Sequence, residues 1–298
     1  MHSNDTAAPV RAGGREWAGL AVLALPTLLV SLDTFVMLLA LPHLAADLGA
    51  SGTEQLWIMD IYGFLVAGLL ITAGALGDRI GRRRLLLAGA AAFGAASVLA
   101  AYATSPTMLI AARALLGVAG ATLTPSTLSL IMNLFSDARQ RATAVGIWAG
   151  CFTVGAIIGP LVGGAMLERF WWGSVLLLGV PAMVLLLILG PLLLPEYRDP
   201  AAGRLDPTSV AVSLAALLSV IYGLKQVAQH GPHLLPLLAL LAGVALAVVF
   251  VRRQVKLAHP LLDLKLFANR GFGVALGAML AYTLLSGGTM VFVAQAAV

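Results

Sequence analysis

The sequence predicts an all-α protein that crosses a membrane several times, and three observations support this prediction. Of the 298 residues, 60% are hydrophobic and only 10% are charged, whereas a soluble domain carries about 25% charged residues. The mean hydropathy is +0.97. Long apolar runs recur along the chain, with short polar clusters between them. A soluble fold cannot bury this much apolar surface, whereas a surrounding lipid bilayer makes its burial unnecessary.

Each apolar run is long enough to form a membrane-spanning helix. A hydrocarbon core about 30 Å thick needs about 20 residues of helix. Helices are expected because they satisfy their own backbone polar groups, as lipid requires. The expected helices cover residues 18–42, 56–77, 85–103, 107–133, 142–166, 172–194, 207–225, 234–251 and 271–298. The prediction is therefore a polytopic bundle of about nine helices.

The apolar runs fall into three parts. The first six lie close together within residues 1–194. A helix pair with its polar loops covers residues 195–270, and the last helix occupies residues 271–298. The chain ends inside this last run without a charged cap or a polar tail. We therefore expect the chain to be a fragment or a truncated reading frame.

The basic residues between the runs predict the orientation in the membrane. If the amino terminus is cytoplasmic, only Arg169 and Lys225 among the loop cations fall outside. The clusters that then lie inside are residues 78–84, 134–141, 195–206 and 252–270. An excess of lysine and arginine is typical of cytoplasmic loops. We predict a multi-pass protein of the cell membrane with a cytoplasmic amino terminus.

The sequence lacks the patterns of an enzyme or of a nucleic-acid-binding protein. It holds no nucleophile elbow, no phosphate-binding loop and no glycosidase-type pair of carboxylates. Cys151 is the single cysteine, which excludes a disulfide within the chain, and the histidines do not have metal-ligand spacing. The net charge of +5 arises from short clusters between apolar runs. We therefore expect no catalysis, no cofactor, no metal and no nucleic-acid partner.

Three ionisable residues lie inside the predicted helices. Asp33 is deep in the first helix, about 13 Å from its outer end at Pro42. Arg113 lies about 9 Å below the outer end of the fourth helix, and Asp60 lies about one turn into the second. A charge at the centre of a membrane helix costs about 2.5–3.5 kcal/mol, so it normally faces a cavity or a partner.

These charges have the chemistry that proton coupling needs. A neighbouring arginine and desolvation act in opposite directions on the pKa of a carboxylate, so the carboxylate can load and release a proton. All three charges lie in the outer half of the membrane and can share a water-filled cavity. Asp33 can instead merely bond a neighbouring helix, and Asp60 can simply face water. Phe35, Met37 and Tyr62 can line a substrate site, or contact lipid and the core.

The loop after the second helix reads GALGDRIGRRR and combines glycines with charges. Glycines permit a tight turn between packed helices. An acid beside arginines can form charge-assisted hydrogen bonds that hold a cytoplasmic gate. The candidate gating residues are Gly77, Asp78, Arg79, Gly81, Arg82 and Arg83. Anchoring by positive charge would also explain the arginines, but it would not explain the acid or the glycines.

The fifth predicted helix carries several glycines around a proline. Small residues at four-residue spacing let helices approach closely, and a proline removes one backbone hydrogen bond and allows a bend. The candidate residues are Gly155, Gly159, Pro160, Gly163 and Gly164. Ordinary close packing explains each glycine equally well when it is taken alone.

Several of these segments resemble motifs of the major facilitator superfamily. GALGDRIGRRR is similar to its loop between helices 2 and 3, LIAARALLGVAGA to its helix 4 motif, and GAIIGPLVGG to its antiporter motif in helix 5. LDTFVMLLALP, around Asp33, resembles the helix 1 motif of the fourteen-helix drug:proton antiporters. FWWGSVLLLGVP resembles exporters of quaternary ammonium compounds and methyl viologen. The sequence departs from this pattern at Gly179, where an asparagine is usual.

The resemblance implies two six-helix bundles with alternating access between them, and an extra helix pair between the bundles. Residues 1–194 would form the N-terminal bundle, and residues 195–270 would hold the inserted pair. Residues 271–298 would be the first helix of an incomplete C-terminal bundle. Arg113 occupies the position that this family links to proton coupling. We expect the missing C-terminal bundle to be required as a partner.

The expected function is secondary active transport, namely the efflux of lipophilic cationic drugs or biocides in exchange for protons. The lipid bilayer, a small cationic substrate and protons would be its partners. Asp33 and Arg113 would carry proton coupling. The expected substrate contacts are Asp33, Asp60, Phe35, Met37 and Tyr62. Two alternatives stay open, a truncated or partner-requiring membrane protein without transport of its own, and an exporter of another metabolite or antibiotic.

Overall fold

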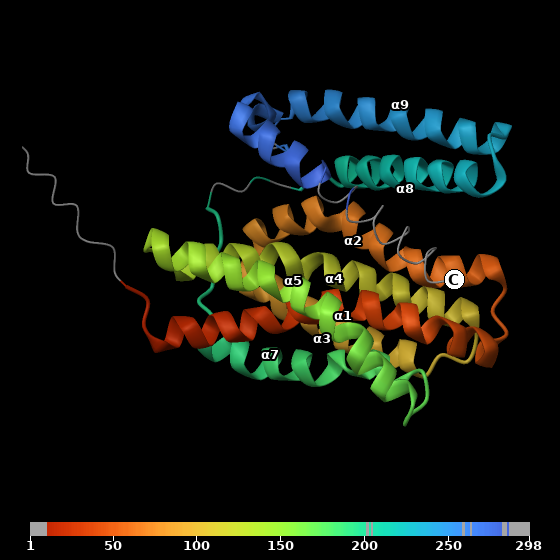
Figure 1. Cartoon of the computed structure of the whole chain (residues 1–298). Coiled ribbons are helices and arrows are strands. Elements are labelled where there is room, and N and C mark those ends of the chain that lie inside the picture. Colours follow the sequence, from red (N-terminus) through yellow and green to blue (C-terminus); the bar gives the residue numbers. More distant parts are fainter. Residues whose placement is uncertain are drawn as a thin grey trace, which may run out of the picture.

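The computed structural model describes residues 11–200, 203, 205–257, 260–262, 264–281 and 285. Within these residues the regular structure is helical (Figure 1). The elements are α1 (Gly14–Leu48), α2 (Gly52–Ile80), α3 (Arg82–Ala101), α4 (Pro106–Leu134), α5 (Ala138–Leu167), α6 (Ser174–Leu177), α7 (Gly179–Leu193), α8 (Pro207–His230), α9 (Leu234–Lys256) and the 3-10 helix η1 (Leu264–Ala268).

The described helices confirm the predicted all-α transmembrane fold. Eight segments are long and apolar enough to cross a membrane, with α6 and α7 together forming one span. This span, expected over residues 172–194, is interrupted at Leu178. A shorter apolar helix, Arg270–Ala281, lies at the start of the ninth expected helix. The remainder of that helix, apart from residue 285, lies outside the described residues.

Side-chain and backbone caps fix several helix ends. The Ser51 hydroxyl accepts a hydrogen bond from the Glu54 backbone N–H, and the Glu54 carboxylate accepts one from the Ser51 backbone N–H at 2.9 Å. The Asp137 carboxylate accepts from the Gln140 N–H at 2.9 Å where α5 begins. Gly49 adopts a left-handed conformation, with a φ of 64°, where α1 ends. These are the residue types that end helices most readily.

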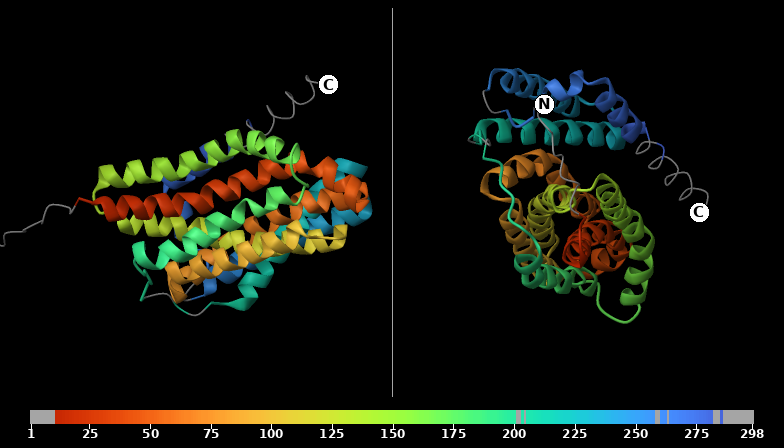
Figure 2. Two further views of the ribbon diagram at one scale, coloured as in Figure 1. Left: turned by 90° about the horizontal axis from the view of Figure 1, so that it is seen from below. Right: turned by 90° about the vertical axis from the view of Figure 1, so that its left-hand side faces the viewer.

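The helices α1 to α5 and α7 form one bundle with roughly parallel axes (Figures 1 and 2). Its core contains large side chains with no more than 2% exposure, including Leu23, Met37, Phe93, Leu116 and Phe135. Other large apolar side chains point outward from the bundle, and Leu161 on α5 is 70% exposed. Such an exposed apolar surface suits a protein whose outer solvent is lipid.

The helices α8 and α9 form an antiparallel pair that lies along α2 at one side of the bundle (Figure 2). At one end of the pair the Asp206 carboxylate accepts a hydrogen bond from the Arg253 guanidinium at 2.7 Å. The Gln254 amide there donates to the Ser209 hydroxyl at 3.0 Å. Polar contacts thus join the start of α8, directly after the 195–206 linker, to the end of α9.

Candidate functional site

Asp33 on α1 and Arg113 on α4 form a buried ion pair. The Arg113 Nη1 donates to Asp33 Oδ2 at 2.6 Å. The Arg113 side chain is 1% exposed and the Asp33 side chain is 13% exposed. The rise per residue predicted that both charges lie in the outer half of the membrane. In the folded bundle the two side chains point toward one another. Each charge therefore has the partner that burial in an apolar environment requires.

Arg113 also contacts α2 through two further groups. Its Nε donates to the Ile58 carbonyl at 3.2 Å, and its guanidinium lies 4.8 Å from the centroid of the Tyr62 ring. A guanidinium over an aromatic face is an attractive cation–π contact. Gly117 makes room for this arrangement, since a Cβ there would come within 2.7 Å of the Tyr62 carbonyl oxygen. Arg113 thus joins three helices.

Little free space adjoins the Asp33 carboxylate. The cavity that it lines has a volume of about 10 Å³ and is shared with Phe93, Leu178 and Gly179. Asp60 does not line this small cavity. Gly179, where the family pattern has an asparagine, borders this small cavity. A side chain at Gly179 would begin 3.3 Å from the Phe93 ring.

The other expected substrate residues are distributed among different environments. Asp60 forms an ion pair with Lys225 of α8, so a cation that binds Asp60 has to displace that lysine. Met37 is 1% exposed in the core, and Tyr62 is 4% exposed beneath Arg113. Phe35 lies against α5, where its Cβ limits the space at Gly159. The described structure therefore does not gather these residues in one pocket.

The turn between α2 and α3 is held by the charges that the sequence had singled out. The Arg82 Nε donates to Asp78 Oδ1 at 2.8 Å. Arg79 donates to the Gly203 carbonyl. Gly81 has a φ of 112°, a left-handed conformation that favours glycine. The Arg82 side chain packs against Gly77, and a Cβ at Gly77 would come within 2.9 Å of it.

The segment after α7, residues 194–199, packs directly on this turn, and we call it the 194–199 strap. The Arg82 backbone N–H donates to the Tyr197 carbonyl at 2.8 Å, and the Asp199 N–H donates to the Asp78 carbonyl at 2.9 Å. The Glu196 carboxylate accepts from the Arg83 backbone N–H at 3.0 Å. The strap therefore ties the end of α7 to the α2–α3 turn by both backbone and side-chain bonds.

Glu196 and Lys225 are two residues whose contacts sequence reasoning missed. Glu196 directly follows the sixth apolar run, next to Pro195, and lies within 4 Å of the Arg83 and Arg84 guanidinium groups. An acid directly after an apolar run, in a protein with an arginine-rich loop, was the available signal. Lys225 entered the sequence analysis only as a loop cation that falls outside, and no local pattern indicated its pairing with Asp60.

The glycines of α5 do not all face a neighbouring helix. A Cβ at Gly155 would lie 2.7 Å from Ser31 Cβ, one at Gly159 would lie 3.0 Å from Phe35 Cβ, and one at Gly163 would lie 3.1 Å from a Val36 methyl group. A Cβ at Gly164 would meet nothing within 4 Å. Pro160 is exposed. Three glycines at four-residue spacing therefore form the α1–α5 contact, which the Ser31 hydroxyl completes by donating to the Phe152 carbonyl at 2.6 Å.

Comparison with known proteins places these features among transporters. A family model described as Major Facilitator Superfamily matches residues 23–298. The chain is 50% identical over 262 residues to the multidrug efflux pump LfrA of Mycolicibacterium smegmatis, covering 88% of this chain and 52% of the relative. It is 39% identical over 261 residues to the methyl viologen resistance protein SmvA of Salmonella typhimurium, covering 86% and 52%. It is 35% identical over 257 residues to a puromycin resistance protein of Streptomyces alboniger, covering 86% and 51%.

The chain spans about half the length of the curated relatives it matches. Among solved structures it is similar to a peptide transporter in complex with sulfate, with a TM-score of 0.56 and 18% identity over 80% of this chain and 69% of that one. It is also similar to an inward-facing, unoccupied bacterial homologue of the human lysosomal transporter Spinster, with a TM-score of 0.52 and 21% identity over 82% and 62%. These two likenesses concern the fold alone.

Proposed function

Because the chain belongs to the Major Facilitator Superfamily, we propose that it carries the proton-coupling half of an exporter of lipophilic cations. Residues 1–194 would form the N-terminal bundle, residues 195–270 would hold an inserted helix pair, and residues 271–298 would begin a second bundle. The amino terminus would be cytoplasmic, in the cell membrane. The name of one similar protein, a multidrug efflux pump, supports export, and that of another, a methyl viologen resistance protein, supports a cationic substrate.

The observation that carries the proposal is the contact between Asp33 and Arg113. Asp33 is the protonatable group of the pair, and it lies in the bundle interior. An ionised carboxylate there depends on its cationic partner. A proton or a substrate cation at Asp33 would compete with Arg113 for the same charge. Proton binding and cation binding would therefore exclude each other, which is the minimum requirement of exchange.

The remaining contacts of Arg113 suggest how this exchange would move helices. Protonation of Asp33 would remove the charge that attracts Arg113, while the contacts of Arg113 with Ile58 and Tyr62 would persist. The link between α1 and α4 would weaken, and the link between α2 and α4 would stay. A proton would thus release α1 from a rigid α2–α4 unit. This is a discrete change that alternating access can use.

The α2–α3 turn would act as a cytoplasmic gate in this scheme. The hydrogen bond between Asp78 and Arg82 joins the two sides of the turn. The backbone hydrogen bonds of the 194–199 strap connect the turn to the end of α7. Charge-assisted hydrogen bonds of this kind are strong enough to stabilise one state, and they re-form readily after separation. The gate would therefore couple the end of α7 to the position of α2 and α3.

The test is efflux of methyl viologen from energised membrane vesicles that hold the full-length transporter, including its C-terminal bundle, with and without a pH gradient. Asp33→Asn removes the titrating group and keeps the size of the side chain. We expect this variant to lose uphill efflux, while downhill movement persists. Asp47→Asn is the matched control, because Asp47 lies on the same helix, is exposed and accepts a hydrogen bond from Trp172 at 2.7 Å. Uphill efflux with unchanged pH dependence in Asp33→Asn would refute the proposal.

A second candidate function is the export of a neutral antibiotic or metabolite. The similarity to a puromycin resistance protein supports an antibiotic as the substrate, without deciding its charge. The same vesicles distinguish the two candidates, because a cation exporter should show competition between protons and methyl viologen at Asp33. An exporter of neutral compounds should instead transport its substrate without such competition.

A further inference from the structure

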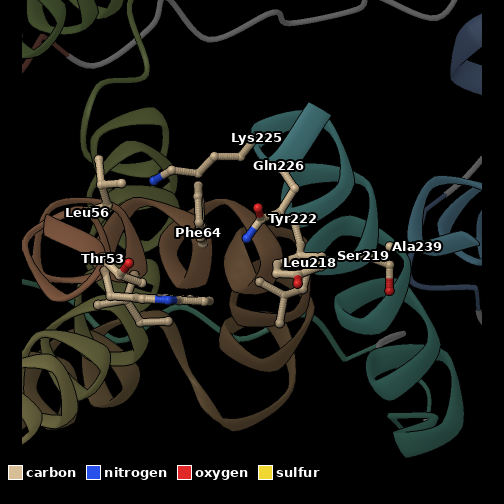
Figure 3. A pocket seen from close by; sticks show the side chains of 11 residues that line it. Thr53, Leu56, Phe64, Leu218, Ser219, Tyr222, Lys225, Gln226 and Ala239 are labelled. Atoms are coloured by element: carbon tan, nitrogen blue, oxygen red, sulfur yellow. The ribbon is translucent and has the colours of Figure 1, made fainter. Parts of the chain in front are cut away.

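The proposed function leaves unused a pocket of about 420 Å³ between α2 and α8 (Figure 3). Its volume lies within the range of about 300–1,000 Å³ that is typical of ligand pockets. Its lining shares no residue with the small cavity beside Asp33. Both walls belong to helices of membrane-spanning length, so a ligand can enter this pocket from the bilayer.

The lining changes from polar to apolar along the two helices. The end near the start of α2 holds Thr53 and Trp57, and the neighbouring end of α8 holds Lys225 and Gln226. Toward the middle of the helices the walls include Phe64 and Leu218, and Tyr222 and Ser219 are the residues there that carry a hydroxyl. Thr53 and Phe64 are eleven residues apart, or about 16 Å along the helix. The pocket therefore has one end with several polar groups, which we call its mouth, and a largely apolar wall beyond it.

Lys225 is the cation at this mouth. Its ammonium pairs with Asp60 and lies 5.9 Å from the centroid of the Phe64 ring. An ammonium has three N–H donors, so Lys225 can hold a phosphate oxygen while it remains bound to Asp60. Trp57 lies at the same end, and tryptophan side chains favour the headgroup level of a bilayer. Lys225 and Trp57 are thus the two mouth residues that would suit a lipid headgroup.

We propose that this pocket binds a phospholipid with an anionic headgroup. The phosphate would contact Lys225, and one acyl chain would run along the apolar wall toward Leu218. A basic group between transmembrane helices is the chemistry that recognises anionic lipid headgroups. A lipophilic cation fits less well, because Lys225 repels it and already occupies Asp60. The site would stabilise the contact of the α8–α9 pair with α2, and it does not depend on transport.

The test is native mass spectrometry of the purified protein, titrated with dioleoylphosphatidylglycerol or dioleoylphosphatidylcholine. Lys225→Gln should weaken phosphatidylglycerol binding about fivefold, the factor that one lysine near a membrane surface contributes. Phosphatidylcholine binding should change little. Ala239→Phe fills the pocket from α9 and should reduce the binding of both lipids. Arg169→Gln, which removes a cation elsewhere at the same end of the bundle, is the matched control and should leave binding unchanged.

Asp60→Asn separates lipid binding from helix docking. This variant breaks the same α2–α8 ion pair as Lys225→Gln, but it leaves the ammonium free for phosphate. Phosphatidylglycerol should therefore bind it at least as tightly as it binds the original protein. Equal losses of lipid in both variants would overturn the proposal, because they would show that the ion pair matters only for docking α8. Unchanged binding in Ala239→Phe, or a pocket that takes up tetraphenylphosphonium and no lipid, would overturn it as well.

Discussion

Alanine substitutions along α5 should destabilise the protein in an order set by its contact with α1. At Gly155, the added Cβ would lie 2.7 Å from Ser31 Cβ and 2.8 Å from the Leu28 backbone oxygen. The shortest distances are 3.0 Å at Gly159 and 3.1 Å at Gly163, and there is no neighbour within 4 Å at Gly164. The expected order of destabilisation is therefore Gly155, then Gly159 and Gly163 together, and last Gly164.

The magnitude follows from three contributions. Forcing an extra carbon into a packed contact costs about 1–3 kcal/mol. At Gly155 the alanine also displaces the Ser31 hydroxyl from the Phe152 carbonyl, and a hydrogen bond contributes about 0.5–1.5 kcal/mol. Replacing glycine by alanine inside a helix stabilises that helix by about 1 kcal/mol, which offsets part of this cost. Gly155→Ala should therefore lower the free energy of unfolding by about 2 kcal/mol, whereas Gly164→Ala should raise it by up to about 1 kcal/mol.

The assay is thermal unfolding of the purified protein in lipid nanodiscs, followed by size-exclusion chromatography of heated samples. About 1 kcal/mol shifts the unfolding temperature by roughly 2–4 °C for a chain of this size. Gly155→Ala should therefore lower that temperature by about 4–8 °C. Efflux of methyl viologen by the full-length transporter, measured well below the unfolding temperature, then shows whether a folded variant still transports.

The control is built into the same helix. Gly155 and Gly164 receive the same substitution in α5, and both belong to the segment that resembles an antiporter motif. Equal shifts in unfolding temperature for the two variants would refute the packing argument. A folded Gly164→Ala protein that no longer transports would show that this glycine has a role apart from helix contact.

Three further outcomes are expected. Gly81→Ala should destabilise the α2–α3 turn, because the turn has a positive φ and an added Cβ would come within 2.5 Å of the Glu196 carboxylate; faster proteolysis of the turn measures this effect. The Arg253 guanidinium holds the pKa of the Asp206 carboxyl well below its usual value. The contribution of the Asp206 carboxylate to stability is therefore complete above about pH 4, and it is lost only as the pH falls through the lowered pKa. Thermal melts of Asp206→Asn should thus show a deficit that is constant from pH 8 to 5 and smaller in stronger acid. In a cysteine-free background, an impermeant thiol reagent added outside cells should label a cysteine at Thr104 and miss one at Ser136, and the reverse pattern would overturn the proposed orientation.

The depth of each charge in the membrane could be predicted from the sequence, because depth depends only on the start of a helix and its rise per residue. Asp33 and Arg113 were placed at similar depth in this way, and the structure brings them into contact. The glycines of the α2–α3 turn were likewise predictable, since a positive φ at Gly81 is a local requirement. The caps at Ser51 and Asp137 are also local.

The direction in which each charge points could not be predicted. In a soluble helix the polar face marks the outside, but in lipid the outer face is as apolar as the core. The pattern of α2 therefore does not indicate that Asp60 faces α8 while Tyr62 faces Arg113. The contact of Glu196 with the α2–α3 turn joins residues more than 100 positions apart in the sequence, so no local pattern predicts it.

The sequence by itself determined the membrane-spanning helices, their order and the depth of their buried charges. Each of these depends on residues within one helix or one turn, and on the thickness of the bilayer. The tertiary structure alone decided which charges meet, which glycines carry contacts and where the pocket between α2 and α8 forms. Those outcomes depend on how each helix is rotated about its axis. That rotation is set by simultaneous packing against several neighbours, which no local pattern contains.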